Sequence, residues 1–267
     1  MAVLECSRRN GVATLLMSRT QVKNAFNGEM AMALLEALAQ IRHDPEVRAV
    51  VLTGAGTDFC AGGDVSSMAR MDGDAAAVRQ RMELVNSVIS ALADLPCPVI
   101  AAVDGVAFGA GFSLALAADF ILAAPRARFC MVFARIGAIP DMGATYHLPR
   151  LVGLQKAREL IYSAREIDAA QALEMGVVLE VVADNDLHLR ANELARSMAC
   201  MSPLAFNMTK RLLSHSLNND WSRQLNEEAQ AQAIAMSCDY FKDATLRFMR
   251  KQPLLYRWPQ QARSADQ

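Results

Sequence analysis

Residues 59–64 read FCAGGD, and residues 101–111 read AAVDGVAFGAG. Each stretch follows or includes an apolar run typical of a buried strand, and the second leads directly into an apolar helical segment at 112–118. Glycine permits a positive φ and a close approach of backbone to a ligand. The free N–H groups at the start of a helix attract negative charge. The two stretches therefore predict loops whose N–H groups can face a ligand, although each alone also fits an ordinary tight turn.

Strands and helices alternate around these loops. An Asn10-Gly11 turn is expected to join two strands. Strands are predicted at residues 12–17, 48–53, 98–103 and 119–124, and helices at 29–43, 75–93 and 111–118. After residue 154 the pattern is almost entirely helical, with a single further strand predicted at 177–182. We therefore predict an α/β core over residues 1–200 and a helical region over 201–267 that packs on the core or on a neighbouring copy.

The composition is that of a globular protein. The chain has 267 residues, of which 53% are apolar and 21% charged, and its net charge is -1 without a long Lys/Arg run, so nucleic acid is not an expected partner. No apolar run reaches about 18 residues, and the N-terminus does not resemble a signal peptide, so we expect a cytoplasmic protein without membrane contact. The four dispersed histidines predict no metal site. The six cysteines form no CxxC pair and are expected to be buried free thiols.

Two other interpretations of the glycine loops fit less well. Neither loop completes a dinucleotide-binding fingerprint, because Phe59 and Leu114 stand where the third glycine belongs. Residues 111–115 (GFSLA) resemble the nucleophile elbow of a serine hydrolase, but an eight-residue loop lies between Val103, at the end of the preceding strand, and Phe112. A serine hydrolase is therefore disfavoured.

Together and in order, the motifs resemble the crotonase (enoyl-CoA hydratase/isomerase) family. That family carries F-x-A-G-x-D, matched by residues 59–64, and A-A-V-x-G-x-A-x-G-x-G, matched by residues 101–111. Its G-x-I-P and T-x-x-L-P-R-x-x-G segments are matched by residues 137–140 and 145–153, and the resemblance extends from Arg19 with Asn24-Ala25 to residues 247–253. The resemblance implies a crotonase-like ββα spiral core with a C-terminal helical trimerisation region. It also implies an acyl-CoA substrate, no cofactor beyond the substrate's own coenzyme A, and a homotrimer or hexamer.

The resemblance further implies an oxyanion hole. Its donors would be the backbone N–H groups of Gly63 and Ala110, which would bind the thioester oxygen where enolate charge develops. Further substrate contacts are implied for Lys23, Ala25, Ala61, Gly62, Asp64, Met68, Gly109, Ser113, Phe133 and Lys251.

Several of these residues have a structural alternative. Lys23 and Lys251 match the basic residues with which the family binds coenzyme A, but each also fits a surface charge. Asp64 also fits as the cap of the next helix. Four methionines fit either an apolar acyl pocket or core filling: Met68, Met71, Met82 and Met142.

The sequence departs from the family's hydratases at both catalytic glutamates. Ser113 and Phe133 stand at those two positions. Adding water requires one group to activate water and another to protonate carbon. The chain is therefore poorly equipped for hydration.

One carboxylate remains, Asp141, in the segment IPDMG at residues 139–143. Some isomerases of the family carry an acidic residue in this turn, including Δ3,Δ2-enoyl-CoA isomerases and the isomerase of phenylacetyl-CoA breakdown. Because moving a double bond needs only one proton shuttle, the resemblance implies an enoyl-CoA isomerase with Asp141 as its acid/base. Three alternatives stay open: Asp141 as a mere turn residue after Pro140, a hydratase that uses other groups, and a catalytically silent acyl-CoA binder.

Overall fold

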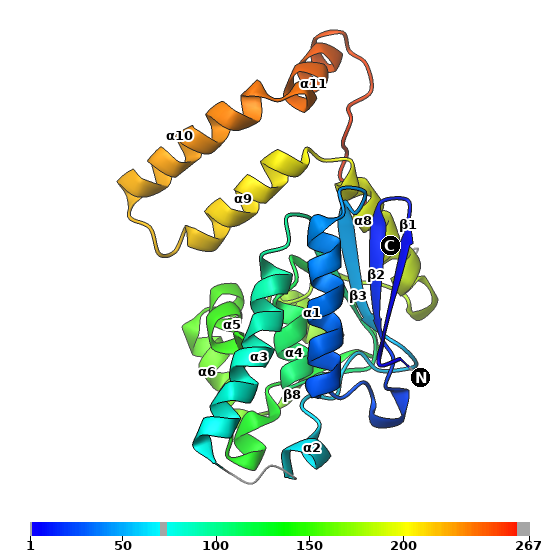
Figure 1. The fold of residues 1–267 in the computed structure, drawn as a ribbon, viewed down its shortest axis with the longest axis vertical. Helices are drawn as coiled ribbons and strands as arrows, with labels where there is room; N and C mark the ends of the chain where they lie inside the picture. Colours follow the sequence, from blue (N-terminus) through cyan, green and yellow to red (C-terminus); the bar gives the residue numbers. More distant parts are fainter. Residues whose placement is uncertain (1, 70–73, 261–267) are drawn as a thin grey trace.

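A six-stranded sheet runs through the core of this computed structural model, which describes residues 2–69 and 74–260 (Figure 1). Its strand order is β1 (Leu4–Arg9), β2 (Val12–Met17), β3 (Ala49–Gly54), β4 (Val99–Val103), β6 (Phe120–Ala123) and β9 (Glu180–Val181). The β1–β2 pair is antiparallel, and all the other neighbours are parallel. Every residue of β3 and β4 is buried, as their largely apolar sequences predict for strands covered on both faces.

A second, three-stranded sheet adjoins the glycine loops. It has the order β5 (Val106–Phe108), β7 (Arg128–Cys130) and β8 (Glu166–Asp168). None of these strands was expected from the sequence, and the expectation of a single strand after residue 154, at 177–182, was wrong because β8 also follows that residue. Strands of three residues are too short to show a periodicity, and their hydrogen bonds depend on distant partners.

Helices cover both faces of the large sheet. Those of the core are α1 (Gly28–His43), α2 (Val65–Ala69), α3 (Ala75–Ala93), α4 (Ala110–Leu116), α5 (Ala144–Val152), α6 (Leu154–Ser163), α7 (Ala169–Glu174) and α8 (Leu187–Ala199). Short 3₁₀ turns occur at η1 (Thr20–Val22), η2 (Val132–Ile136) and η3 (Asp184–Asp186). One apolar cluster joins α1, α3 and α4 to the sheet, and a second joins α8 to its opposite face.

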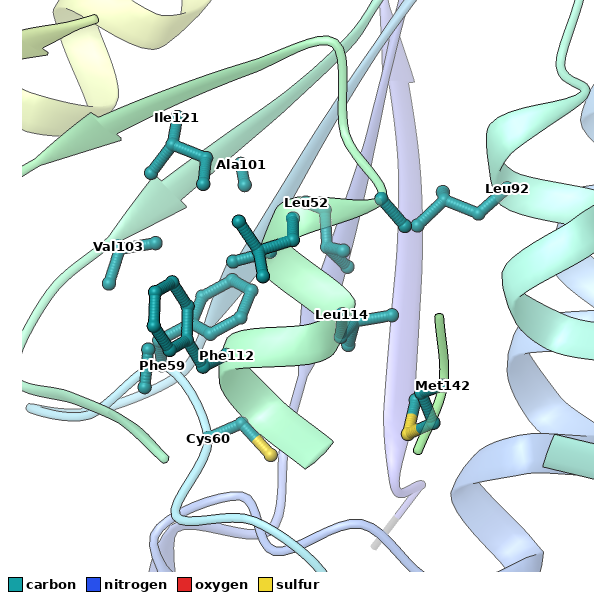
Figure 2. Close-up of a cluster of buried hydrophobic side chains, with 14 of the residues drawn as sticks. Leu52, Phe59, Cys60, Leu92, Ala101, Val103, Phe112, Leu114, Ile121 and Met142 are labelled. Atoms are coloured by element: carbon teal, nitrogen blue, oxygen red, sulfur yellow. The ribbon is translucent and has the colours of Figure 1, made fainter. Parts of the chain in front are cut away.

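Helix α4 lies inside the first of these clusters (Figure 2). All seven of its residues are buried. Phe112 points from α4 toward Phe59, and its ring centroid is 5.2 Å from that of Phe129. Leu114 and Met142 lie on the other side of the helix (Figure 2). This packing fixes the start of α4, where the second glycine loop ends.

Three C-terminal helices form an arm that extends away from the core (Figure 1). These are α9 (Pro203–His215), α10 (Trp221–Ser237) and α11 (Asp239–Met249), and none contains a buried residue. After α11 the chain returns to the core, where Trp258 contacts Phe120 with ring centroids 5.5 Å apart. The helical nature predicted for this region is confirmed.

The cysteines differ in part from their prediction. Cys60, Cys97 and Cys130 are buried, and all six thiols are free. Cys6 and Cys200 are exposed, so the expectation of burial was wrong for these two. Cys6 lies on the edge strand β1, which has water on its outer side, and Cys200 follows the end of α8. Among the described residues, no helix is long and apolar enough to cross a membrane.

Candidate active site

The first glycine loop is attached to the segment 23–26. The N–H of Phe26 donates to the carbonyl of Gly62 (2.7 Å), and the N–H of Asp64 donates to the carbonyl of Phe26 (2.9 Å). In a planar trans peptide the C=O and N–H groups point in opposite directions. Because the Gly62 carbonyl faces Phe26, the N–H of Gly63 points away from the segment 23–26.

The two glycine loops touch backbone to backbone. A Cβ atom on Gly62, whose φ is +106°, would lie 2.9 Å from the Phe108 carbonyl oxygen and 3.9 Å from the Ala110 nitrogen. A Cβ atom on Gly111 would lie 2.2 Å from the Cys60 carbonyl oxygen. Larger residues at these positions would separate the loops. The glycines therefore bring the N–H groups of Gly63 and Ala110 into one region.

The second loop presents the first turn of α4. Ala110 is the first residue of this helix, so its N–H has no acceptor within the helix. Among the backbone hydrogen bonds of residues 2–69 and 74–260, neither the Gly63 N–H nor the Ala110 N–H is a donor. The geometry thus leaves both predicted oxyanion donors available to a ligand.

Neither Ser113 nor Phe133, which the resemblance places at the glutamate positions of a hydratase, can transfer a proton here. Ser113 is completely buried, and its hydroxyl donates to the Gly109 carbonyl oxygen (Oγ···O 3.1 Å). Phe133 is buried against the second loop, where a Cβ atom on Gly109 would lie 3.7 Å from Phe133 Cζ. The Ser113 hydroxyl is thus bound to backbone rather than directed at a substrate, and Phe133 has no ionisable group.

Asp141 lies at the first position of a tight turn. Its carbonyl accepts a hydrogen bond from the Ala144 N–H (3.0 Å), and the two residues between them have φ values of +53° (Met142) and +76° (Gly143). Two successive positive φ values are typical of a type I′ turn, and at a residue other than glycine they cost energy. The Met142 side chain, only 1% exposed, holds this conformation by packing beside α4 (Figure 2). The turn therefore carries Asp141 to the flank of α4.

The Asp141 carboxylate is unusual in its environment. Its Oδ1 atom is buried and has no hydrogen-bond partner within the described part of the chain. Burial raises the pKa of this carboxyl, while its own backbone N–H and the charge of Arg81 oppose the increase. A buried oxygen without a hydrogen-bond partner lowers the stability of the fold by roughly 1–3 kcal/mol, so its presence requires an explanation. A ligand that supplies a proton is one such reason.

Asp64 is engaged within the protein. Oδ2 accepts from Arg19 Nη2 (2.8 Å), and Oδ1 accepts from the Ser66 hydroxyl (2.6 Å) and from the Ser67 N–H (3.2 Å). The last bond confirms that Asp64 caps α2. The hydrogen bonds from Ser66 and Arg19 lower its pKa to about 2. Its predicted substrate contact stays a prediction.

The structure brings most of the predicted contact residues together, but not all of them. Ala61 donates its N–H to the Lys23 carbonyl (2.9 Å), and the buried Ala25 accepts from the Arg19 guanidinium, so these residues line the first loop. The Lys23 side chain is 61% exposed and lies 3.7 Å from the Asp58 carboxylate. Lys251 follows α11, at the opposite end of the molecule from α2 (Figure 1).

The structure distinguishes core filling from an acyl pocket for two of the four methionines. Met142 belongs to the core cluster, and Met82 packs against it, so both fill the core. Met71 and the Met68 side chain lie outside the described residues.

Asn24 is a site residue to which the sequence alone assigned no structural role. Its side chain is completely buried, accepts from the Arg19 N–H (2.9 Å) and donates to the carbonyls of Ala55 (2.9 Å) and Asp58 (2.7 Å). Asn24 therefore ties the segment 19–26 to the loop that precedes the first motif. In the sequence, Asn24 is recognisable only as a polar residue in a turn, and this pattern does not identify the distant residues that it contacts.

Two observations delimit the site. A cavity of about 760 Å³ between α3, α4 and α9 contains Asp119 and Lys210 but touches neither Gly63 nor Asp141, so it is separate. Within the described ranges, no group of three His, Cys, Asp or Glu residues could hold a metal ion.

Comparison with known proteins gives consistent results. The family model for enoyl-CoA hydratase/isomerase matches residues 7–260. A 1,2-epoxyphenylacetyl-CoA isomerase of Escherichia coli K12 is 38% identical over 91% of this chain and 94% of its own. A probable enoyl-CoA hydratase of Rhodobacter capsulatus is also 38% identical, over 91% and 93%. The crystal structure of an enoyl-CoA hydratase/isomerase from Cupriavidus metallidurans CH34 superposes with a TM-score of 0.94, at 40% identity and covering 98% and 99% of the two chains.

Proposed function

Since the chain belongs to the crotonase (enoyl-CoA hydratase/isomerase) family, we propose that it moves the double bond of an enoyl-CoA from C3–C4 to C2–C3. The observation that carries the proposal is Asp141. It is a carboxylate with a buried, unpartnered oxygen, and Ser113 and Phe133 stand where hydratases have their two glutamates.

The proposed reaction is a single proton shuttle. The thioester carbonyl oxygen accepts hydrogen bonds from the N–H groups of Gly63 and Ala110. The ionised Asp141 carboxylate removes a proton from C2, and the electron pair of the broken C–H bond delocalises into a dienolate with its charge on that oxygen. The protonated Asp141 then returns the proton to C4, and the C2–C3 double bond forms. Each oxyanion donor in such a site is worth about 3–4 kcal/mol of transition-state stabilisation.

The raised pKa of Asp141 suits this role. A base is most effective when its pKa approaches the working pH, and burial moves the pKa of Asp141 in that direction. The proline before it restricts the backbone, and the buried Met142 after it anchors the turn. The carboxylate thus loses little entropy when it engages a substrate.

Two other functions remain as outcomes of the test. Hydration has the support of relatives named as hydratases, in Rhodobacter capsulatus and in Clostridium acetobutylicum, where a short-chain-enoyl-CoA hydratase is 34% identical. Against hydration, neither Ser113 nor Phe133, at the two positions expected for a hydratase's glutamates, is a carboxylate. Binding of acyl-CoA without turnover is the third possibility.

The deciding experiment follows the absorbance of the conjugated enoyl thioester. A 3-enoyl-CoA and a 2-enoyl-CoA are incubated separately with the protein. We expect absorbance to appear with the 3-enoyl substrate, because isomerisation creates the conjugated bond. Loss of absorbance with the 2-enoyl substrate indicates hydration. No change with either substrate, together with measured binding, indicates a silent binder.

We further propose that the α9–α11 arm packs against neighbouring copies in a trimer or hexamer. The support is its lack of buried residues in the single chain and its exposed apolar side chains, among them Leu213 (67%), Trp221 (75%) and Phe248 (74%). If Lys251 binds coenzyme A, it then does so at the site of another copy, because it directly follows α11, which lies at the end of the chain's fold away from α2 (Figure 1). A cytoplasmic location and independence from any added cofactor stay predictions.

A further inference from the structure

The Ser113 hydroxyl is bonded to the peptide that carries the second oxyanion donor. Its Oγ atom lies 3.1 Å from the carbonyl oxygen of Gly109. That carbonyl and the Ala110 N–H are the two ends of one peptide group. Ser113 thus acts, through a single hydrogen bond, on the same planar unit that presents the donor to a ligand.

Two hydrogen bonds act directly on this peptide, and a third anchors the peptide before it. The Gly109 carbonyl accepts both from the Ser113 N–H (2.9 Å) and from the Ser113 hydroxyl, while the Gly109 N–H, which belongs to the 108–109 peptide, donates to the Cys130 carbonyl (2.8 Å). Because the peptide is planar, fixing the direction of its C=O also fixes the direction of its N–H. The helical bond from the Ser113 N–H would exist with any residue at 113, whereas the hydroxyl bond is specific to this side chain.

The backbone at Gly109 needs such support. Its φ of 48° and ψ of -117° fall in a region that residues other than glycine rarely adopt. Backbone of this kind persists where the surroundings over-determine it. A hydrogen bond to the carbonyl also polarises the peptide and strengthens the N–H at its other end as a donor.

The peptide of the first oxyanion donor has a weaker side-chain bond. The carbonyl of Gly62, which shares a peptide with the Gly63 N–H, accepts from the backbone N–H of Phe26 (2.7 Å) and, at 3.8 Å, from the Cys60 thiol. A thiol is a weaker donor than a hydroxyl. The sequence AGFSLAL of α4 contains one polar side chain, and it belongs to Ser113. The peptide of the Ala110 donor therefore receives the stronger side-chain hydrogen bond of the two.

We propose that Ser113 is a positioning residue of the oxyanion hole, whose hydroxyl holds the 109–110 peptide so that the Ala110 N–H faces the thioester oxygen. The inference rests on the oxyanion hole of the proposed function. It assigns a task to the serine at a position where hydratases have a glutamate, and this task involves neither proton transfer nor substrate contact.

The test compares Ser113→Ala, which deletes the hydroxyl, with Ser113→Thr, which keeps it. The control is Thr53→Val, which deletes another buried hydroxyl bonded to a backbone carbonyl (Thr53 Oγ1 to Ala102 O, 2.9 Å). Two quantities are measured: kcat and KM with a 3-enoyl-CoA, and the carbonyl stretching frequency of bound trans-2-hexenoyl-CoA labelled with ¹³C at the thioester carbon.

In the parent we expect binding to lower the carbonyl frequency. Ser113→Ala should retain a smaller part of that shift and lose about 10-fold in kcat, less than the roughly 100-fold cost of removing a donor outright, with KM nearly unchanged. Ser113→Thr should restore both values toward the parent, and Thr53→Val should alter neither.

Two results would overturn the inference in different ways. If the parent shows the shift and Ser113→Ala retains all of it, Ser113 does not position the donor, whatever happens to kcat, and the oxyanion hole still stands. If the parent itself shows no shift, the oxyanion hole is wrong, and the role of Ser113 falls with it.

Discussion

Arg19 Nη2 lies 2.8 Å from Asp64 Oδ2, and the two side chains are only 13% and 10% exposed. Arg19 also donates to the carbonyl of Ala25. The ion pair therefore links the segment 19–26 to the residue directly after Gly63. The first oxyanion donor thus lies in a loop held by backbone bonds to Phe26 on one side and by a shielded ion pair on the other.

Asp64→Ala should destabilise the protein by about 3 kcal/mol, because it leaves the guanidinium of Arg19 shielded from water without its partner. Chemical denaturation at neutral pH measures this change. The control is Glu83→Ala, which breaks the exposed Arg79–Glu83 pair (83% and 65% exposed) and should cost no more than about 1 kcal/mol. Equal losses of stability in the two variants would show that the shielded Arg19–Asp64 pair stabilises the protein no more than an exposed pair does.

Gly63→Pro removes one oxyanion donor and should reduce turnover by about 100-fold or more. Gly63 is not among the glycines with positive φ, so proline does not conflict with the sign of this angle. Circular dichroism and thermal unfolding must show that the variant is folded. Full activity in a folded variant would remove Gly63 from the oxyanion hole.

The pKa of Asp141 predicts two effects of opposite sign. Only the ionised carboxylate can act as the base, so kcat/KM should fall as the pH falls through the folded-state pKa, above the ordinary 3.8. Stability behaves differently, because a raised folded-state pKa means that the folded protein binds this proton more tightly than the unfolded chain. Stability from this group is therefore complete below pH 3.8 and declines as the pH rises through the folded-state pKa.

The Asp141→Asn variant has no carboxyl group at this position, so it does not lose stability in this way as the pH rises. It should therefore unfold at a higher temperature than the parent at pH 7. The difference should shrink as the pH approaches 4. Thermal unfolding across this range provides the measurement. A variant that is less stable than the parent at pH 7 would indicate that the carboxylate has a stabilising partner.

The full-length protein should sediment as a trimer or hexamer at micromolar concentration. Removing residues 221–267 deletes α10 and α11, uncovers apolar side chains of α9 and should cause aggregation. Analytical ultracentrifugation of both forms measures this outcome. A stable full-length monomer would contradict the role proposed for the arm.

Much of the large sheet could be predicted because its strands and helices carry local patterns. The apolar runs of β3 and β4 and the helical spacing of Leu34, Leu38 and Ile41 place these elements within one or two residues. The glycine loops were recognisable because backbone contact requires glycine at Gly62 and Gly111. These features depend on residues close in the sequence.

What the sequence did not reveal depends on long-range contacts. The three-residue strand β5 exists through its pairing with β7, about twenty residues later in the chain. The bond of Ser113 to Gly109 requires knowing that α4 begins at Ala110 rather than at the Gly111 expected. The unpartnered oxygen of Asp141 becomes apparent only when every nearby donor has been placed.

The most direct test of the account is the turnover of a 3-enoyl-CoA by Asp141→Asn, with acyl-CoA binding measured in parallel. Asparagine keeps the shape of the side chain and cannot act as a base. The account predicts that isomerisation falls by about 100-fold or more while the dissociation constant stays close to that of the parent. Isomerisation at the parent rate would contradict it and would leave Asp141 as a turn residue only.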